Sequence, residues 1–279
     1  MERNGYPEEA YFTFSYSPVF EADGSIGGAF CTLTEETYRV VSDRRIQTLR
    51  KLAEATLQTK TEKDAATQAI NSLGNNPQDL TFALLYLLDE TKTKAQLIAS
   101  TRLEVGTAVS PREIEFQHNG DDLWLLPTVL ESGKTKIVQV DESKYGQLPI
   151  GDWSESSKLA AVLPIDSSGH TASGCLIVGI NPFRPFNDGY QGFLNLVAGQ
   201  IATAIANARA YEAERQRAEA LAELDRVKTE FFSNVSHEFR TPLSLMLSLL
   251  EDALADSHEP LPTSQQQRLE LFSVTASAC

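Results

Sequence analysis

The sequence predicts an α+β protein, in which an antiparallel sheet flanked by helices is followed by a long connector helix and a helical hairpin. Three observations predict this class. Strand-length apolar runs separated by turn residues lie between residues 79 and 180. Helical periodicity dominates before this region, over 35–73, and again from residue 187 onward. After Gly199 the chain has no further glycine, which favours a helix longer than one domain needs.

Length, charge and cysteine usage limit the possible functions. The 279 residues correspond to about two domains. The formal charge of −14 argues against non-specific binding to nucleic acid or to an anionic membrane. Without a signal-peptide pattern or an apolar stretch of about 18 residues, we expect a cytoplasmic protein with no membrane insertion. The cysteines form no cluster, so we expect no metal site, and Cys31 and Cys175 are interpreted as small buried residues in strands.

The N-terminal segment, residues 1–36, predicts a β-hairpin. Aromatic and polar residues alternate from Tyr11 to Tyr16, and Asp23-Gly24 is a strong turn signal. The return strand is expected over 26–33, with a bulge at Gly27-Gly28. Because two strands alone are marginally stable in water, we expect this hairpin to be the end of a larger sheet whose beginning is missing.

The next two segments are a helical region and an α+β domain. Residues 37–78 are expected to form a helical linker, with a domain boundary at the helix-breaking run 74–77. Residues 79–209 are expected to form one compact α+β domain. Within it we expect one helix over 123–131 and strands over 82–88, 96–102, 135–140, 159–165 and 174–180.

A nearly continuous helix is expected from an N-cap at Asn187 to about residue 256. Such a helix leaves its domain and continues as a connector, which places a fourth segment over 210–279. Thr263 and Ser264 each begin a possible capping box, which predicts a second helix of about 16 residues. The chain therefore ends in a short helical hairpin.

One face of the long helix carries an apolar stripe. With Val235 set at 0° and about 100° per residue, the stripe covers about −40° to 80°. His237 falls at about 200°, on the opposite face, and Thr241 follows one turn later. Pro242 lacks the N–H that would pair with the carbonyl of Glu238, so a bend is expected there. The stripe contains Leu221, Leu224, Phe231, Phe232, Phe239, Pro242, Leu243, Met246, Leu249 and Leu250.

The run FFSNVSHEFRTPL, residues 231–243, resembles the H-box of sensor histidine kinases. The resemblance implies that His237 is the phosphoacceptor, whose imidazole attacks the γ-phosphate of ATP and whose phosphoryl group passes to a response-regulator aspartate. It also implies that Glu238 accepts or orients a proton during attack, and that Thr241 positions water for dephosphorylation. A neutral imidazole is a suitable nucleophile near neutral pH.

Two further resemblances concern the preceding segments. Residues 193–209 resemble the end of a GAF domain, which implies that 79–209 is a sensor domain whose ligand the sequence does not identify. Residues 11–18, with Gly24 and Gly27-Gly28, resemble the last two strands of a PAS domain. The order PAS–GAF–phosphoacceptor helix is typical of soluble sensor kinases.

The chain departs from the family in one respect. Only 21 residues follow His258, so the ATP-binding domain is expected to be missing and the chain truncated at both ends. Gly133-Lys134-Thr135 imitates the end of a P-loop, but Thr128 replaces its first glycine. We therefore expect that this chain alone does not autophosphorylate. The remaining histidines, His118, His170 and His258, are interpreted as ordinary surface residues.

Three hypotheses remain. The first is the sensing and phosphoacceptor part of a histidine kinase that forms a homodimer through residues 210–255. The second is a GAF-type small-molecule binding and dimerisation module without kinase activity. The third is an inert fragment. The residues that separate the first from the others are His237, Glu238 and Thr241, with Pro242.

Overall fold

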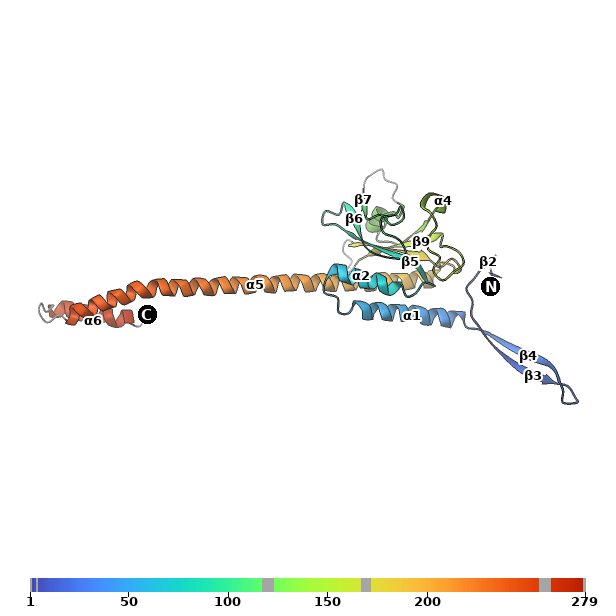
Figure 1. Cartoon of the computed structure of the whole chain (residues 1–279), viewed down its shortest axis with the longest axis horizontal. Coiled ribbons are helices and arrows are strands. Elements are labelled where there is room, and N and C mark those ends of the chain that lie inside the picture. Colours follow the sequence, from blue (N-terminus) through green and yellow to red (C-terminus); the bar gives the residue numbers. More distant parts are fainter. Residues whose placement is uncertain (1, 4, 117–122, 167–171, 256–261, 278–279) are drawn as a thin grey trace. The chain divides into compact units, whose positions relative to one another are not determined.

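The α+β class and the long C-terminal helix are both confirmed. The computed structural model describes residues 2–3, 5–116, 123–166, 172–255 and 262–277 (Figure 1). The chain divides into two compact units, Met1–Glu212 and Ala213–Cys279, which we call the N-terminal and C-terminal units. The division falls inside one helix, α5 (Asp188–Ala255). Asn187 caps this helix as expected, because its Oδ1 accepts from the N–H of Tyr190 at 3.0 Å.

The N-terminal unit is built on a six-stranded antiparallel sheet with the order β7-β6-β5-β10-β9-β8. The two central strands, β5 and β10, are buried on both faces, which explains their continuous apolar sequences. Strand β7 was not expected, because three residues are too few to show an alternating pattern. The strands are β5 (Leu80–Leu88), β6 (Lys94–Thr101), β7 (Glu113–Glu115), β8 (Lys136–Gln139), β9 (Leu159–Ile165) and β10 (Gly174–Ile180).

The two faces of this sheet build separate cores. Leu85, Leu163 and Leu176 point to the face covered by α2 (Glu62–Leu73) and the first part of α5. Their neighbours in sequence point to the opposite face, which is closed by α3 (Leu126–Ser132) and by Trp124. Successive residues of a strand point to opposite faces, so one run of apolar residues supplies both cores. The short helix α4 (Glu142–Tyr145) was not expected from the sequence.

Residues 37–78 are helical, as expected for the predicted helical linker, but they belong to the same compact unit as the sheet, so no domain boundary lies at 74–77. They form α1 (Thr37–Thr56) and α2, and Ala69, Ile70 and Leu73 of α2 are fully buried in the same core as the sheet. The glycine- and proline-containing run 74–77 is a tight corner between α2 and β5. Turn residues mark such a corner as strongly as they mark a domain boundary, and the sequence pattern does not distinguish the two.

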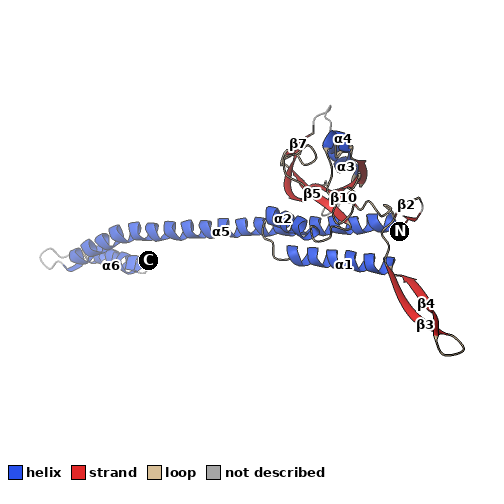
Figure 2. Cartoon of the chain, turned by 45° about the vertical axis from the view of Figure 1, so that its right-hand side comes forward, coloured by secondary structure: helices blue, strands red, loops and turns tan. Residues whose placement is uncertain are grey.

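The predicted N-terminal hairpin is present as β3 (Phe12–Phe20) and β4 (Ile26–Glu35), after the two-residue strands β1 (Glu2–Arg3) and β2 (Tyr6–Pro7). The register shifts between Val19 and Phe20, which confirms the bulge at the glycine pair. Cys31 lies in β4 but is exposed, so its predicted burial is wrong. The reason is visible in Figure 2, where β3 and β4 pair only with each other. In the described part of the chain, no other strand covers the face that Tyr16 and Cys31 share.

The C-terminal unit is a helical hairpin. The predicted second helix is α6 (Thr263–Ser277), and both views show it running back beside the end of α5 (Figures 1 and 2). None of the helices in the described ranges combines the length and the apolar character needed to cross a bilayer.

Candidate functional site

The end of α5 has one face that packs within its own hairpin. Leu243, Leu247, Leu250 and Leu254 are half-buried, and their spacing of four, three and four residues places them on one side of the helix. Leu269 of α6 is also half-buried. These leucines therefore form the side of α5 that is partly covered within the single chain.

His237 is exposed on α5, as the helical wheel predicts. Glu238 and Thr241 are exposed as well. The side chains of His237 and Glu238 make no hydrogen bond or ion pair with any described residue. The His237 imidazole is therefore open to an incoming phosphoryl donor, and no cation of the described residues forms an ion pair with the Glu238 carboxylate.

The backbone around His237 carries two local changes to the helical hydrogen-bond pattern. The Thr241 hydroxyl donates to the carbonyl of His237 at 3.4 Å, one turn earlier. Pro242 has no N–H for the carbonyl of Glu238. The helix nevertheless continues through Pro242, and α5 curves over its last part (Figure 1). The structure therefore agrees with the expectation that this stretch bends.

A second apolar face of α5 is uncovered within the single chain. At about 100° per residue its members lie between about −80° and 60°, beside the face that packs in the hairpin and away from His237. Their exposed fractions range from 50% to 70%. The members, which we call the exposed stripe, are Leu221, Leu224, Val227, Phe231, Phe232, Phe239, Leu245, Met246 and Leu249.

The N-terminal unit has several surface grooves among its described residues. One groove, of about 490 Å³, lies between the edge of the sheet and α5 and is lined by Lys134, Thr135 and Asn195, among others. The Thr135 hydroxyl donates to Asn195 Oδ1 at 3.3 Å. Gly133 ends α3 with a φ of +62° and lies at a helix C-terminus. Phosphate groups bind at helix N-termini, so Gly133-Lys134-Thr135, which follows the C-terminus of α3, does not form a P-loop.

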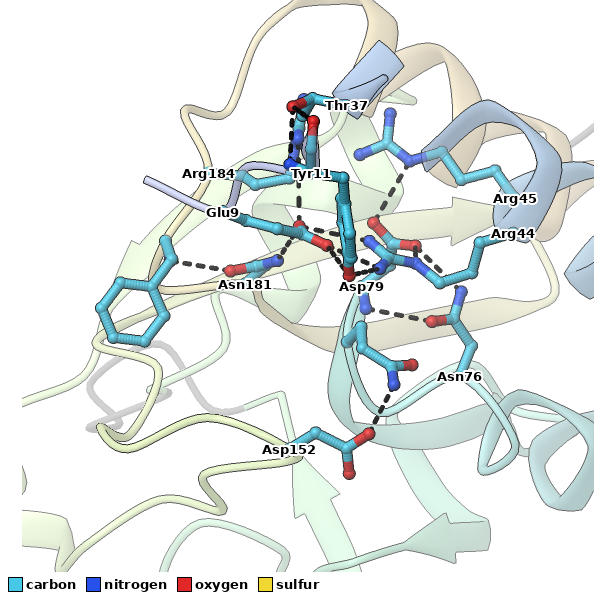
Figure 3. Close-up of polar contacts among 12 residues, drawn as sticks. Glu9, Tyr11, Thr37, Arg44, Arg45, Asn76, Asp79, Asp152, Asn181 and Arg184 are labelled. Carbon is cyan, nitrogen blue, oxygen red and sulfur yellow. Dashed lines mark hydrogen bonds and ion pairs between the residues drawn. The ribbon is translucent and has the colours of Figure 1, made fainter. Parts of the chain in front are cut away.

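Sequence reasoning missed a buried cluster of charged and polar residues in the N-terminal unit (Figure 3). Its members come from segments far apart in sequence, and none belongs to a motif. No periodicity marks them either, so the sequence held no signal for the cluster. We call it the ionic hub, and it consists of Glu9, Arg44, Arg45, Asn76, Asp79, Asn181 and Tyr190.

Other residues singled out in the sequence lie outside the described part of the chain. These are His118, His170 and His258.

Part of this chain is similar to histidine kinases. Residues 227–277 match the family model of the His Kinase A (phospho-acceptor) domain, and His237 lies inside this range. A stretch of 128 residues, 43% of the chain, is 31% identical to the hybrid signal transduction histidine kinase G of Dictyostelium discoideum. A stretch of 43 residues, 15% of the chain, is 51% identical to histidine kinase P4 of Formosa agariphila. The chain spans 4% and 3% of the length of these two curated relatives.

The N-terminal unit is similar to solved GAF domains. The GAF domain of a phosphoenolpyruvate-protein phosphotransferase from Coxiella burnetii is 19% identical, with a TM-score of 0.45. The similarity covers 61% of this chain and 97% of that one. The match at 227–277 confirms the resemblance of residues 231–243 to the phosphoacceptor segment of sensor histidine kinases.

Proposed function

We propose, from the phosphoacceptor domain at residues 227–277, that this chain is the sensing and phosphoacceptor portion of a two-component sensor histidine kinase. His237 receives the γ-phosphoryl group of ATP and passes it to an aspartate of a response regulator. The observation that carries the proposal is the exposed position of His237 on α5, inside the matched range. A separate ATP-binding domain has to reach this side chain, and an exposed imidazole allows that approach.

In the phosphorylation reaction His237 acts as the nucleophile and Glu238 as the proton acceptor. A lone pair on a neutral His237 ring nitrogen attacks the γ-phosphorus, so an N–P bond forms while the P–O bond to ADP breaks. The ring then carries a positive charge and releases its remaining proton to the Glu238 carboxylate. In the second step the other ring nitrogen regains a proton, the N–P bond breaks to release neutral imidazole, and a bond forms between phosphorus and a carboxylate oxygen of the regulator.

Thr241 has a role in removing the phosphoryl group from the chain, not in adding it. It lies one turn from His237 and is exposed, so its hydroxyl can hold a water for hydrolysis of a phosphoryl group. In the structure the same hydroxyl donates to the carbonyl of His237, which fixes its rotamer near the acceptor residue. We assign Thr241 to dephosphorylation rather than to phosphoryl acceptance.

The exposed stripe supports a homodimer. An apolar face of this length on a helix is costly in water, and a second copy of α5 in parallel orientation covers it with identical side chains. The dimer surface proposed here comprises residues 210–255. It leaves His237 free, because His237 lies on the other side of the helix.

The experiment supplies a separate histidine-kinase ATP-binding domain together with radioactive ATP, and it measures acid-labile, base-stable phosphate on this chain. We expect label on the parent and on the control His258→Gln, and no label on His237→Gln. We also expect no label when the chain is incubated with ATP alone. An unlabelled parent would refute the kinase assignment and leave the alternative, a dimerising GAF-type binding module.

A further inference from the structure

The ionic hub lies where three segments of the N-terminal unit meet. Glu9 precedes the β3–β4 hairpin, Arg44 and Arg45 belong to α1, and Asp79 directly precedes β5. The side chains of Glu9 and Asp79 are 2% and 0% exposed, and those of both arginines are about 15% exposed or less. A buried carboxylate without a cation is strongly destabilising, so each of these charges depends on its partner.

Asp79 binds both arginines. Arg44 Nε donates to Asp79 Oδ2 at 2.7 Å, and Arg45 Nε donates to Oδ1 at 3.3 Å. Asn76 Nδ2 donates a further hydrogen bond to Asp79 Oδ2 at 3.1 Å. Burial raises the pKa of the Asp79 carboxyl, but the hydrogen bond and charge of Arg44 and the charge of Arg45 outweigh it and hold this pKa below its ordinary value.

Glu9 joins the same network from the N-terminal side. Arg44 Nη1 donates to Glu9 Oε1 at 2.6 Å, and Asn181 Nδ2 donates to Oε2 at 3.0 Å (Figure 3). The backbone N–H of Glu9 also donates to the carbonyl of Phe183 at 2.9 Å. One arginine, Arg44, therefore connects the segment before the hairpin to the corner that precedes β5.

Both ends of the hairpin are tied down beside Glu9. The N–H of Tyr11 donates to the Thr37 hydroxyl at 2.9 Å, and the N–H of Glu36 donates to the carbonyl of Tyr11 at 2.9 Å. The Tyr11 hydroxyl in turn donates to Glu9 Oε1 at 3.0 Å. A displacement of β3 and β4 is therefore transmitted first to Glu9 and to the start of α1.

The opposite side of the hub holds the first turns of α5. The Arg45 guanidinium lies 4.4 Å from the centre of the Tyr190 ring and donates to the carbonyl of Gly189 at 3.4 Å. Tyr190 Oη donates to the carbonyl of Asp79 and accepts from the N–H of Asn181 at 3.0 Å. Tyr190 is buried, and burial raises the pKa of its hydroxyl, which keeps it a neutral donor.

We infer that the ionic hub couples the β3–β4 hairpin to the first turns of α5, so that a change at the hairpin reaches the output helix without passing through the sheet. Moving Glu9 leaves Arg44 buried without one of its two carboxylates, and Arg44 and Arg45 share the remaining one, Asp79. The hydrogen bonds that hold Tyr190 then change together with those of Arg44. The regulatory meaning of this coupling rests on the proposed function, because α5 also carries His237.

Hydrogen exchange of the full chain tests the coupling itself. Glu9→Gln keeps the shape of the side chain and removes its charge. We expect exchange of the amides over 190–197 to accelerate roughly tenfold, the effect of losing one charge-assisted hydrogen bond, with the central amides of β10 unchanged. Glu54→Gln is the matched control, because Glu54 forms an exposed ion pair with Arg50 at 2.8 Å on α1, the helix that carries Arg44 and Arg45, and we expect no change at 190–197.

Two results would overturn the inference. The first is an effect of Glu9→Gln that stays within residues 2–36. The second is a uniform acceleration through the whole N-terminal unit, including β10, which is the sign of a merely structural ion pair.

A second readout addresses regulation. With the ATP-binding domain supplied, Glu9→Gln is expected to change the rate of phosphate uptake at His237, while Glu54→Gln is not. Equal rates for the parent and Glu9→Gln would refute the regulatory role of the hub. An unlabelled parent would refute the proposed function, and the exchange experiment would still decide whether the hub couples the hairpin to α5.

Discussion

At the residue scale, the assignment of Glu238 makes a kinetic prediction. Glu238→Gln removes the proton acceptor and keeps the size of the side chain. We expect phosphorylation of His237 to slow by roughly a hundredfold, the lower end of general-base assistance. The rate is measured from the uptake of acid-labile phosphate with the ATP-binding domain in excess. Glu230→Gln is the control, because Glu230 is an exposed carboxylate on α5 two turns before His237, and a similar loss there would point to a general charge effect.

Thr241 makes a prediction of the opposite kind. Thr241→Ala removes the hydroxyl, so we expect phosphate to leave His237 more slowly while the rate of phosphorylation stays unchanged. The measurement is the decay of purified phosphorylated chain after ATP is removed. Thr241→Ser retains the hydroxyl and should decay like the parent. If alanine and serine variants decay alike, the hydroxyl has no part in dephosphorylation.

Asp79 makes a prediction about stability. Removing one member of a buried ion pair typically costs about 3–5 kcal/mol, so Asp79→Asn should lower the free energy of unfolding by about that amount at neutral pH. Asp43→Asn, at an exposed position on α1, should leave it nearly unchanged. Urea denaturation measures both variants.

The pH dependence of this effect has a defined sign. The pKa of Asp79 is lower in the folded chain than its ordinary value of about 3.9, so the unfolded chain binds more protons between the two values. The contribution of Asp79 is present above the ordinary value and is lost as pH falls through the folded value. The difference between parent and Asp79→Asn should therefore be smaller at about pH 3 than at pH 7. A difference that grows on acidification would contradict the ion-pair account.

Single residues differ in how far the sequence predicts them. His237 was predictable, because its neighbours over 231–243 form a dense motif and because helical geometry places it opposite an apolar stripe. The ionic hub was not predictable, because Glu9, Asp79 and Asn181 are brought together only by the tertiary fold. Cys31 was predicted wrongly for a related reason, since burial depends on what packs on a strand and not on the strand alone.

At the scale of elements, α5 makes a prediction about assembly. Leu249 belongs to the exposed stripe, and its side chain is 64% exposed in the single chain. Leu249→Glu places a charge in the proposed dimer surface, so we expect light scattering at tens of micromolar to show a monomer where the parent is a dimer. Ser244→Glu adds the same charge on the other side of α5 and should remain dimeric. A monomeric parent would refute the dimer.

Elements were predictable where the pattern is local. Strands β9 and β10 have the predicted bounds, because turn residues enclose each apolar run. Helix α2 was predicted as a helix but assigned to a linker. Its apolar face indicates that the helix packs against another element, but the sequence does not identify that element. The three residues of β7 pair at the edge of β6, and such pairing leaves no periodic signal.

At the scale of the whole molecule, the account predicts that the phase of α5 matters. α5 contains both Tyr190, held by the hub, and His237. One residue inserted near Ala218 turns everything downstream by about 100°, whereas seven residues restore the phase to within about 20°. In a chimera with an ATP-binding domain, one inserted residue should change phosphorylation of His237 strongly and seven should change it little. If both insertions behave like the parent, α5 does not transmit a signal as a rigid helix.

The most direct test of the central claim is to locate the phosphate on the chain. The parent is labelled by the supplied ATP-binding domain, kept at alkaline pH, and fragmented by tandem mass spectrometry. The account predicts a single phosphate on His237, which is lost after brief treatment with acid. An acid-stable phosphate on Ser233, Ser236 or Thr241, or a chain with no phosphate, would contradict it.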